Sequence, residues 1–463
     1  MIDPPPNPSR LAPAGRDGRR AAVAVALLVV AFVGVALVKP WGGSVATPSP
    51  TGGTPAAIAA TSAAAPTQAS APPVRTAPPA PVAAAFTIPG PGPAQAAWSG
   101  IDWRRLASDD PLSLVRSVVP WRGGFIALGR DANGGSSSRP MWTSQDGSAW
   151  EPVPFGTGST FWPGSLIVGV AEVPGGLVAI SESVGDACVG TSCPSPESPS
   201  IVAWTSPDGR SWTPHPAGAL GQAIPSGAAQ MVLTAGPAGV VAAANDSAAI
   251  AAISRDGITW EALPDGAFPA QFVINDLRST PSGYVAAGLL VIGEGRWDAT
   301  TLWSADGRRW SPSPSLPAAS VPSVVLAAST YTMSAVTTLV GGGEGLMAIG
   351  REIVTPGRTL WWQSSDGRRW RAVPTYDPLG PTTCGGEGCG LEANGTVAGD
   401  GTRIVALRGG SDAAAWTSTD GRAWRPLHVT GEVPPQEALQ AVLLPGGILM
   451  SDGTATWFGE ARY

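Results

Sequence analysis

Ser254-Arg255-Asp256-Gly257-Ile258-Thr259-Trp260 is one of six copies of the phrase Ser-x-Asp-Gly-x-x-Trp. An Asp-Gly pair between apolar runs is typical of a tight hairpin turn, because Asp offers an acceptor to the turn's own amides and Gly tolerates positive φ. A carboxylate cluster for catalysis or calcium is disfavoured, since successive phrase aspartates lie 48 to 62 positions apart. The six structural aspartates are Asp146, Asp208, Asp256, Asp306, Asp366 and Asp420.

Each phrase belongs to a longer repeat of four expected strands. In the unit around Ser206, apolar runs at 166–173, 177–181 and 201–206 precede a fourth strand at 211–215. Four antiparallel strands per unit are typical of a propeller blade. A chain of 463 residues with 60 Gly, 19 Trp and 13% charged residues fits such an array better than a single compact core.

The two ends of the repeat region predict how the array closes. Residues 439–445, 448–451 and 454–463 form a last set of three strands without a fourth, whereas residues 101–106 match a fourth strand without the first three. Pairing the two ends removes an open sheet edge. The sequence therefore predicts an all-β fold, a seven-bladed β-propeller over residues 97–463 that is closed by pairing of its N- and C-terminal strands.

The phrase resembles the Asp-box, or BNR, repeat of sialidases, sortilin-type receptor ectodomains and a photosynthetic assembly factor, all of which are propellers. The likeness covers some 360 residues and implies the fold more strongly than any function. The family pattern has one residue between Asp and Gly, whereas the two are adjacent in all six copies here. This departure puts the type of hairpin in doubt but not the assignment of the blades.

The N-terminal region predicts a membrane anchor. Residues 21–38 are eighteen apolar or Gly positions, which span about 27 Å as a helix at ~1.5 Å per residue. Four arginines precede this run and Lys39 follows it, which favours a cytoplasmic N-terminus. We expect a cytoplasmic tail at 1–20, a transmembrane helix at 21–38, a disordered Pro/Ala/Thr/Ser-rich linker at 39–96 and an extracytoplasmic propeller in a single-pass cell-membrane protein. A signal peptide cleaved near Ser44-Val45-Ala46 is the alternative.

Short turns and long connections are expected at opposite faces of the blades. The first-to-second turns and the Asp-Gly turns are short and uniform, so the length variation falls on the other face, where binding residues of rigid scaffolds usually lie. Two cysteine pairs occur there, Cys188 with Cys193 and Cys384 with Cys389. In an oxidising compartment each pair is expected to form a local disulfide, with a zinc site from all four as the alternative. The long segments are 131–139, 182–200, 291–299, 313–335, 351–358 and 374–392.

Aromatic, arginine and acidic side chains on this face are the candidate ligand contacts, although packing or solvation is the commoner explanation of such residues. We expect a binding or scaffold module for an envelope protein, peptide or glycan, without a cofactor or a metal. No nucleic-acid partner is expected, since the net charge is −6 and Lys39 is the sole lysine. The candidates are Trp162, Arg296, Trp297, Tyr331, Tyr376, Asp377 and Glu387.

Catalysis is the competing hypothesis. The resemblance to sialidases implies three converging arginines and a Tyr nucleophile, but no Arg-Ile-Pro-like phrase occurs early in the repeats. Five of the arginines lie at Asp-Gly turns and so face away from the variable loops: Arg210, Arg308, Arg309, Arg368 and Arg422. Two carboxylates meeting across the blades would serve an ordinary glycosidase. His215 and His428 have no partners at metal or triad spacing, so no catalytic residue is assigned. An envelope assembly factor is a third hypothesis, which rests on analogy of fold alone.

Overall fold

The structure is a computed structural model that describes much of residues 97–463. All described residues belong to one unit of the chain, residues 85–463. The segments left out within the range are 108–114, 123, 130–140, 148, 154–164, 184–199, 217, 227, 247, 294–295, 314–315, 317–323, 327–328, 332–333, 343–344, 353–358, 374–377, 380–394, 436–439 and 453–454.

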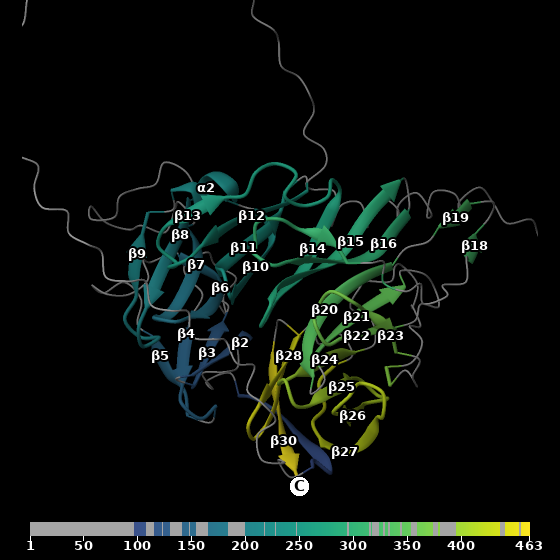
Figure 1. Cartoon of the computed structure of the whole chain (residues 1–463). Coiled ribbons are helices and arrows are strands. Elements are labelled where there is room, and N and C mark those ends of the chain that lie inside the picture. Colours follow the sequence, from purple (N-terminus) through teal and green to yellow (C-terminus); the bar gives the residue numbers. More distant parts are fainter. Residues whose placement is uncertain are drawn as a thin grey trace, which may run out of the picture. The chain divides into compact units, whose positions relative to one another are not determined.

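Five successive repeat units each form one antiparallel sheet whose four strands pair in chain order (Figure 1). The first unit consists of β2 to β5, which are Val115–Trp121, Gly124–Gly129, Met141–Ser144 and Glu151–Val153. The second consists of β6 to β9 (Ser165–Val173, Gly176–Ser183, Ser200–Ser206 and Thr213–His215), and the third of β10 to β13 (Ala229–Gly236, Gly239–Asn245, Ala249–Ser254 and Trp260–Ala262). The fourth consists of β14 to β17 (Phe272–Thr280, Gly283–Gly293, Arg296–Ser304 and Ser311–Pro312), and the fifth of β20 to β23 (Ser334–Gly342, Gly345–Glu352, Thr359–Ser364 and Arg371–Ala372).

The last two units are joined into one eight-stranded sheet, which corrects the predicted count of seven separate blades. Strand β1 pairs antiparallel with β30 and parallel with β27, so it belongs to both units at once. The apolar pattern of residues 101–106 indicated a strand but gave no information on its second edge, and the seven-blade count is therefore wrong. The strands are β1 (Gly100–Arg105), β24 (Thr396–Gly399), β25 (Ile404–Arg408), β26 (Ala414–Ser418), β27 (Arg425–Gly431), β28 (Gln440–Leu444), β29 (Gly447–Ser451) and β30 (Thr456–Arg462).

Polar contacts hold β1 between its two partners. Asp102 accepts a hydrogen bond from the Thr430 hydroxyl on β27 at 2.6 Å and another from the Arg462 guanidinium on β30 at 2.6 Å. Ser99 extends both pairings, since its N–H donates to the Arg462 carbonyl at 2.7 Å and its carbonyl accepts from the His428 N–H at 3.1 Å. One short segment therefore connects residues that are more than 300 positions distant in the sequence.

Two smaller elements lie outside the four-strand pattern. The helix α2 (Ala219–Ala223) follows β9 and buries Leu220 in the core between the second and third units. The strands β18 (Val324–Leu326) and β19 (Ser329–Tyr331) pair antiparallel within the segment 313–335, which the sequence predicted to be a loop. The expected loop 291–299 differs more strongly, because most of it belongs to β15 and β16.

The hydrophobic core lies between successive sheets. Trp204 and Trp212 are fully buried with residues of the first two units, and the pattern repeats at each junction. The first strands of neighbouring units contact one another, and β28 contacts both β24 and β2, so the succession of units closes on itself. Four-stranded antiparallel sheets in closed succession are the architecture of a β-propeller. The described part of the chain is therefore an all-β propeller-type fold.

The Asp-Gly turns interlock neighbouring units. The backbone of Gly307, in the fourth unit, has φ +69° and lies against Val241 and Ile253 of the third. In the same way Gly421 of the sixth unit lies against Met347 of the fifth, and Gly147 of the first against Pro445 of the last. Glycine is needed here because a side chain would enter the neighbouring sheet.

The structure gives no support to the membrane prediction. Among the described residues, no helix has the length and apolar character needed to cross a membrane. The expected single-pass anchor and the localisation derived from it are therefore not carried further. The segments concerned, the tail 1–20, the helix 21–38 and the linker 39–96, lie outside the described residues.

We predict that Asp102 makes closure of the fold sensitive to acid. The hydrogen bond from Thr430 and that from Arg462 lower the pKa of Asp102, so its contribution to stability is present above the ordinary carboxyl pKa and is lost as the pH falls through the lowered value. Asp102→Asn should reduce the melting temperature at pH 7, and the difference from wild type should shrink below about pH 4. Asp265→Asn, at an exposed aspartate, is the control. A difference that stays constant from pH 7 to pH 3 would contradict the prediction.

A second prediction concerns the interlock at Gly307. Gly307→Ala should destabilise the fold by about 1–3 kcal/mol, because the new Cβ would lie 2.8 Å from Ile253 Cδ1 in a backbone conformation that disfavours side chains. Gly446→Ala is the matched control, since a Cβ there meets no described heavy atom within 4 Å. Denaturant unfolding of the two variants measures the difference, and equal midpoints would argue against the interlock.

Candidate functional site

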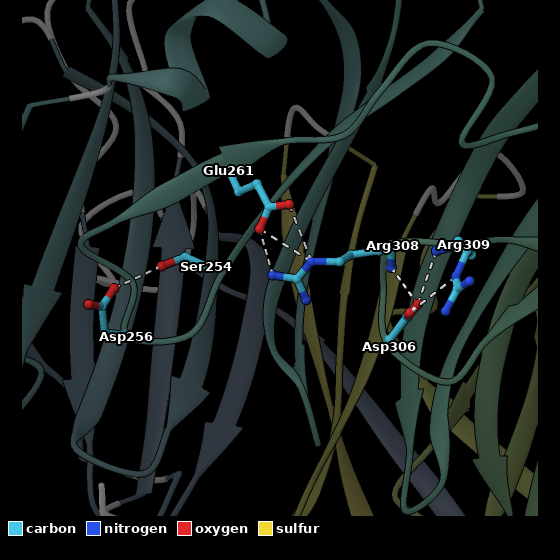
Figure 2. A network of polar contacts seen from close by, with 6 residues as sticks. All are labelled: Ser254, Asp256, Glu261, Asp306, Arg308 and Arg309. Atoms are coloured by element: carbon cyan, nitrogen blue, oxygen red, sulfur yellow. Dashed lines mark hydrogen bonds and ion pairs between the residues drawn. The ribbon is translucent and has the colours of Figure 1, made fainter.

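The six phrases form turns in which the Asp carboxylate binds its own backbone. In the third unit, Asp256 Oδ1 accepts hydrogen bonds from the N–H groups of Ile258 at 2.8 Å and Thr259 at 2.7 Å. The Ser254 hydroxyl donates to Asp256 at 3.0 Å and accepts from the Gly257 N–H at 2.8 Å (Figure 2). We call each such turn, from Ser to Trp, a corner. The carboxylate is therefore engaged inside the corner.

The closing Trp completes five of the six corners, whereas the Trp424 indole N–H of the sixth has no hydrogen-bond partner among the described residues. The Trp260 indole N–H donates to the Gly257 carbonyl at 3.2 Å, and the equivalent bonds of Trp212 and Trp370 measure 3.0 Å and 3.2 Å. These side chains are almost fully buried, so the bond satisfies an indole N–H that has left water. Trp lies four positions after Asp because its indole has to reach the carbonyl of the Gly that directly follows Asp.

The corner carboxyls are held ionised. Partial burial acts to raise the pKa of Asp256, but hydrogen bonds from Thr259, Ile258 and Ser254 outweigh it, so the pKa lies below its ordinary value. The same balance lowers the pKa of Asp208, Asp306, Asp366 and Asp420. A general acid requires the opposite shift. The corners are therefore unsuited to proton donation.

Ionic and cation–π contacts connect corners with neighbouring units. Arg308, two residues after Asp306, binds Glu261 of the preceding unit at 2.7 Å (Figure 2), and Arg210 makes the equivalent pair with Glu151. The Arg368 guanidinium stacks over the Trp303 ring at 3.4 Å from its centroid. These contacts hold the corners in a fixed row.

All corners lie at one end of their sheets, beside the first-to-second turns. Leu177, just after such a turn, pairs with Ser206 of the phrase, and Tyr284 pairs with Ser304 in the same way. We call this end the corner face and the opposite end, where second strands connect to third strands, the loop face. The residues proposed for ligand binding were expected at the loop face.

The structure describes only part of the predicted ligand set. Arg296 and Trp297 begin β16, and Tyr331 ends β19. Trp162, Tyr376, Asp377 and Glu387 lie outside the described residues, as do all four cysteines, Cys188, Cys193, Cys384 and Cys389. The structure therefore places the sequence neighbours Arg296 and Trp297 at one strand end and tests no contact between separate candidates.

Strands β15 and β16 extend this part of the loop face. They pair from Tyr284 and Ser304 at the corner face to Gly293 and Arg296 at the loop face, so ladder hydrogen bonds continue where the sequence predicted a loop. Trp297 is half-buried opposite Val291. Ile292 interrupts the register as an extra residue and exposes 39% of its surface. A half-buried Trp and an exposed Ile are therefore held on a hydrogen-bonded hairpin that contains one bulge.

The neighbouring fifth unit supports the hairpin and contributes buried charges. The Ala299 N–H of β16 donates to the Ser334 hydroxyl of β20 at 3.0 Å. Ser334 pairs with Glu352 at the end of β21, and Glu352 and Arg351 are only 6% and 7% exposed. Arg351 donates to the Gly395 carbonyl at 2.7 Å. Sequence reasoning placed both residues in a variable loop, although two adjacent charges directly after an apolar strand were a signal of this arrangement.

The described residues supply little else for chemistry. They contain no group of three or more His, Cys, Asp or Glu side chains placed to hold a metal ion. His215 contacts the Thr205 hydroxyl at 2.7 Å on adjacent strands. A cavity of about 10 Å³ lies where the last two units join, lined by Trp103, Leu407 and Arg408 among others. It has the size of about one water molecule and accommodates no larger ligand.

Comparison with known proteins gives structural likenesses only. No protein-family profile matches the sequence, and no curated protein matches it. The β-propeller domain of Myceliophteria thermophila Cps50 (Swd1) is similar with a TM-score of 0.43 and 12% identity, over 77% of this chain and 98% of that one. A glycosyl hydrolase from Bacteroides ovatus has a TM-score of 0.29 at 14% identity, over 62% of this chain and 96% of that one.

A third similar structure was reported for the GH130 family of mannoside phosphorylases, which contains glycoside hydrolases that target β-1,2-mannosidic linkages in Candida mannan. It has a TM-score of 0.28 at 14% identity and covers 63% of this chain and 97% of that one. Scores of this size carry no argument about activity. The assignment of the described residues to a β-propeller rests on their own strand pairing.

The corner geometry predicts a difference between two substitutions at Asp256. Asp256→Ala should destabilise the fold by about 1–3 kcal/mol, because it leaves the N–H groups of Ile258 and Thr259 without their acceptor. Asp256→Asn keeps an acceptor oxygen and should cost clearly less. Denaturant unfolding of both variants at pH 7 provides the comparison, and equal losses would assign the effect to charge.

Proposed function

We propose that the protein is a binding module that recognises a protein, peptide or glycan through its loop face. The observation that carries the proposal is the extended β15–β16 hairpin, which holds the partly exposed Trp297 and Ile292 on ladder hydrogen bonds. Aromatic and arginine side chains on a rigid support are the anchors that binding surfaces favour, because little conformational entropy is lost on binding.

Support also comes from polar residues of the neighbouring unit. Buried charges are retained where polar partners fix them, and Arg351 and Glu352 lie next to the strand that binds β16 through Ser334. They help to fix the strand on which the hairpin rests.

The full proposed contact set includes residues beyond the hairpin. We infer that Trp162, Arg296, Trp297, Tyr331, Tyr376, Asp377 and Glu387 contribute to the ligand surface, and that local disulfides Cys188–Cys193 and Cys384–Cys389 stiffen two of its loops. We further propose that the six corners are a variant of the Asp-box repeat with adjacent Asp and Gly. Glycoside hydrolysis of the sialidase type, or a role in assembling a complex, would be the alternative use of the same face.

The proposal predicts that Trp297→Ala weakens binding without loss of stability. The full chain and the variant are compared on glycan arrays and in crosslinking to cell extracts, with bound species quantified against wild type. Ile258→Ala is the matched control, since Ile258 is an apolar residue with 46% exposure at a corner. We expect at least about tenfold weaker binding for Trp297→Ala, as for loss of an aromatic anchor, and no change for the control.

Two results would contradict the proposal. Equal retention of every species by wild type and Trp297→Ala would remove the hairpin from the binding surface. Turnover of a fluorogenic glycoside panel by the full chain would instead favour the hydrolase.

A further inference from the structure

The corner face carries charge that is unevenly divided along the chain. We count each corner segment as the ten residues that begin at the phrase Ser. The segments of the first three units, 144–153, 206–215 and 254–263, hold two arginines against three aspartates and two glutamates, a formal charge of −3. Those of the last three, 304–313, 364–373 and 418–427, hold seven arginines against three aspartates, a formal charge of +4. The formal charge of the corner segments is therefore negative in the first three units and positive in the last three, although the whole chain carries a net charge of −6.

The positive segments lie side by side. Gly367 of the fifth unit is placed against Val285 and Trp303 of the fourth, and Gly421 of the sixth against Met347 of the fifth. Their arginines therefore lie on the corner face of three neighbouring units, and we call them together the arginine arc. Its members are Arg308, Arg309, Arg368, Arg369, Arg371, Arg422 and Arg425.

Most of the arc faces solvent. The Arg309 side chain is 91% exposed and reaches Asp306 only at 3.6 Å. Arg368, Arg369 and Arg422 are exposed as well. Four members are held by protein contacts: Arg308, 29% exposed, pairs with Glu261, Arg368 stacks on Trp303, Arg371 donates to Gln363 and Arg425 donates to the Trp98 carbonyl. The arc thus combines four anchored arginines with the exposed Arg309, Arg369 and Arg422.

The corner aspartates do not offset this charge by pairing one to one. Asp366 Oδ1 already accepts the N–H groups of Arg368 at 2.8 Å and Arg369 at 2.9 Å and the Ser364 hydroxyl at 3.0 Å. Oδ1 of each carboxylate is directed inward to its own turn, and the second oxygen of Asp306, Oδ2, also pairs with Arg309 at 3.6 Å. The guanidinium groups project from the same turns outward.

We propose that the arginine arc binds a linear acidic polysaccharide, through carboxylate or sulfate groups along the polymer. Guanidinium groups bind planar oxyanions through two parallel hydrogen bonds, which an ammonium group does not do. Every basic group of the arc is an arginine, and the corners repeat at regular intervals along neighbouring sheets. A polymer with regularly spaced anions fits such an arrangement. This surface is separate from the loop face and does not depend on the function proposed for it.

Nucleic acid fits the arginine arc less well. Single strands gain much of their affinity from bases stacked on exposed aromatic rings. In the arc, Trp310 and Trp370 are each only 7% exposed, and the Trp303 ring is covered by Arg368. The arc therefore presents positive charge without these three rings being available for base stacking, which favours an acidic polysaccharide over single-stranded nucleic acid.

The test uses the full chain and three probes: heparin as a sulfated polysaccharide, polygalacturonate as a carboxylated one, and a single-stranded DNA oligomer. The variant Arg309→Gln/Arg369→Gln/Arg422→Gln removes three exposed arginines and spares Arg308 and Arg368. The control, Arg122→Gln/Arg210→Gln/Arg255→Gln, removes the same charge from the corner face of the first three units. Thermal melting establishes that both variants are folded.

We expect wild type to bind at least one polysaccharide with an affinity that falls as salt is added. The arc variant should bind at least about tenfold more weakly and should lower the slope of log K against log salt by about 3, one for each lost cation. The control should stay within about threefold of wild type. Three outcomes would overturn the proposal: no binding to either polysaccharide at low salt, equal losses in arc variant and control, or DNA bound more tightly than both polysaccharides.

Discussion

The fold depends on how closely one unit approaches the next, and glycine at the corners sets that distance. Gly257, Gly307 and Gly367 adopt positive φ and lie directly against apolar side chains of the preceding unit. The Asp carboxylate, the Ser hydroxyl and the Trp indole then satisfy the backbone groups of the turn from inside. Close packing of the sheets and satisfaction of the turn are therefore achieved by the same seven residues, which explains why the phrase varies so little.

Much of this was predictable because it is local. The Asp-Gly turn, its flanking strands and the buried Trp all lie within one short segment, so the sequence indicated them directly. The strands predicted at 166–173 and 201–206 correspond to β6 and β8 to within one residue. The pairing of residues 101–106 with the C-terminal strand was also inferred, because two incomplete sets of strands complement one another.

What the sequence did not indicate depends on partners that are distant in the chain. The parallel pairing of β1 with β27, which joins two units into one sheet, leaves no mark on side-chain alternation. The extension of β15 and β16 replaced an expected loop because Ser334 of another unit supplies a hydrogen-bond acceptor. Burial of Arg351 and Glu352 likewise follows from neighbouring strands. For the candidate site, the sequence indicated which types of residue to expect. It did not indicate the strands and buried polar residues that hold them in place.

The position of β1 has a consequence for biosynthesis. This strand leaves the ribosome before every other described strand, yet its two partners, β27 and β30, are among the last to be made. At about 5–20 residues per second, the roughly 360 residues between them take on the order of 20–70 seconds to translate. During that time both edges of the nascent β1 lack their native partners, so its backbone groups are open to pairing with other strands of the growing polypeptide.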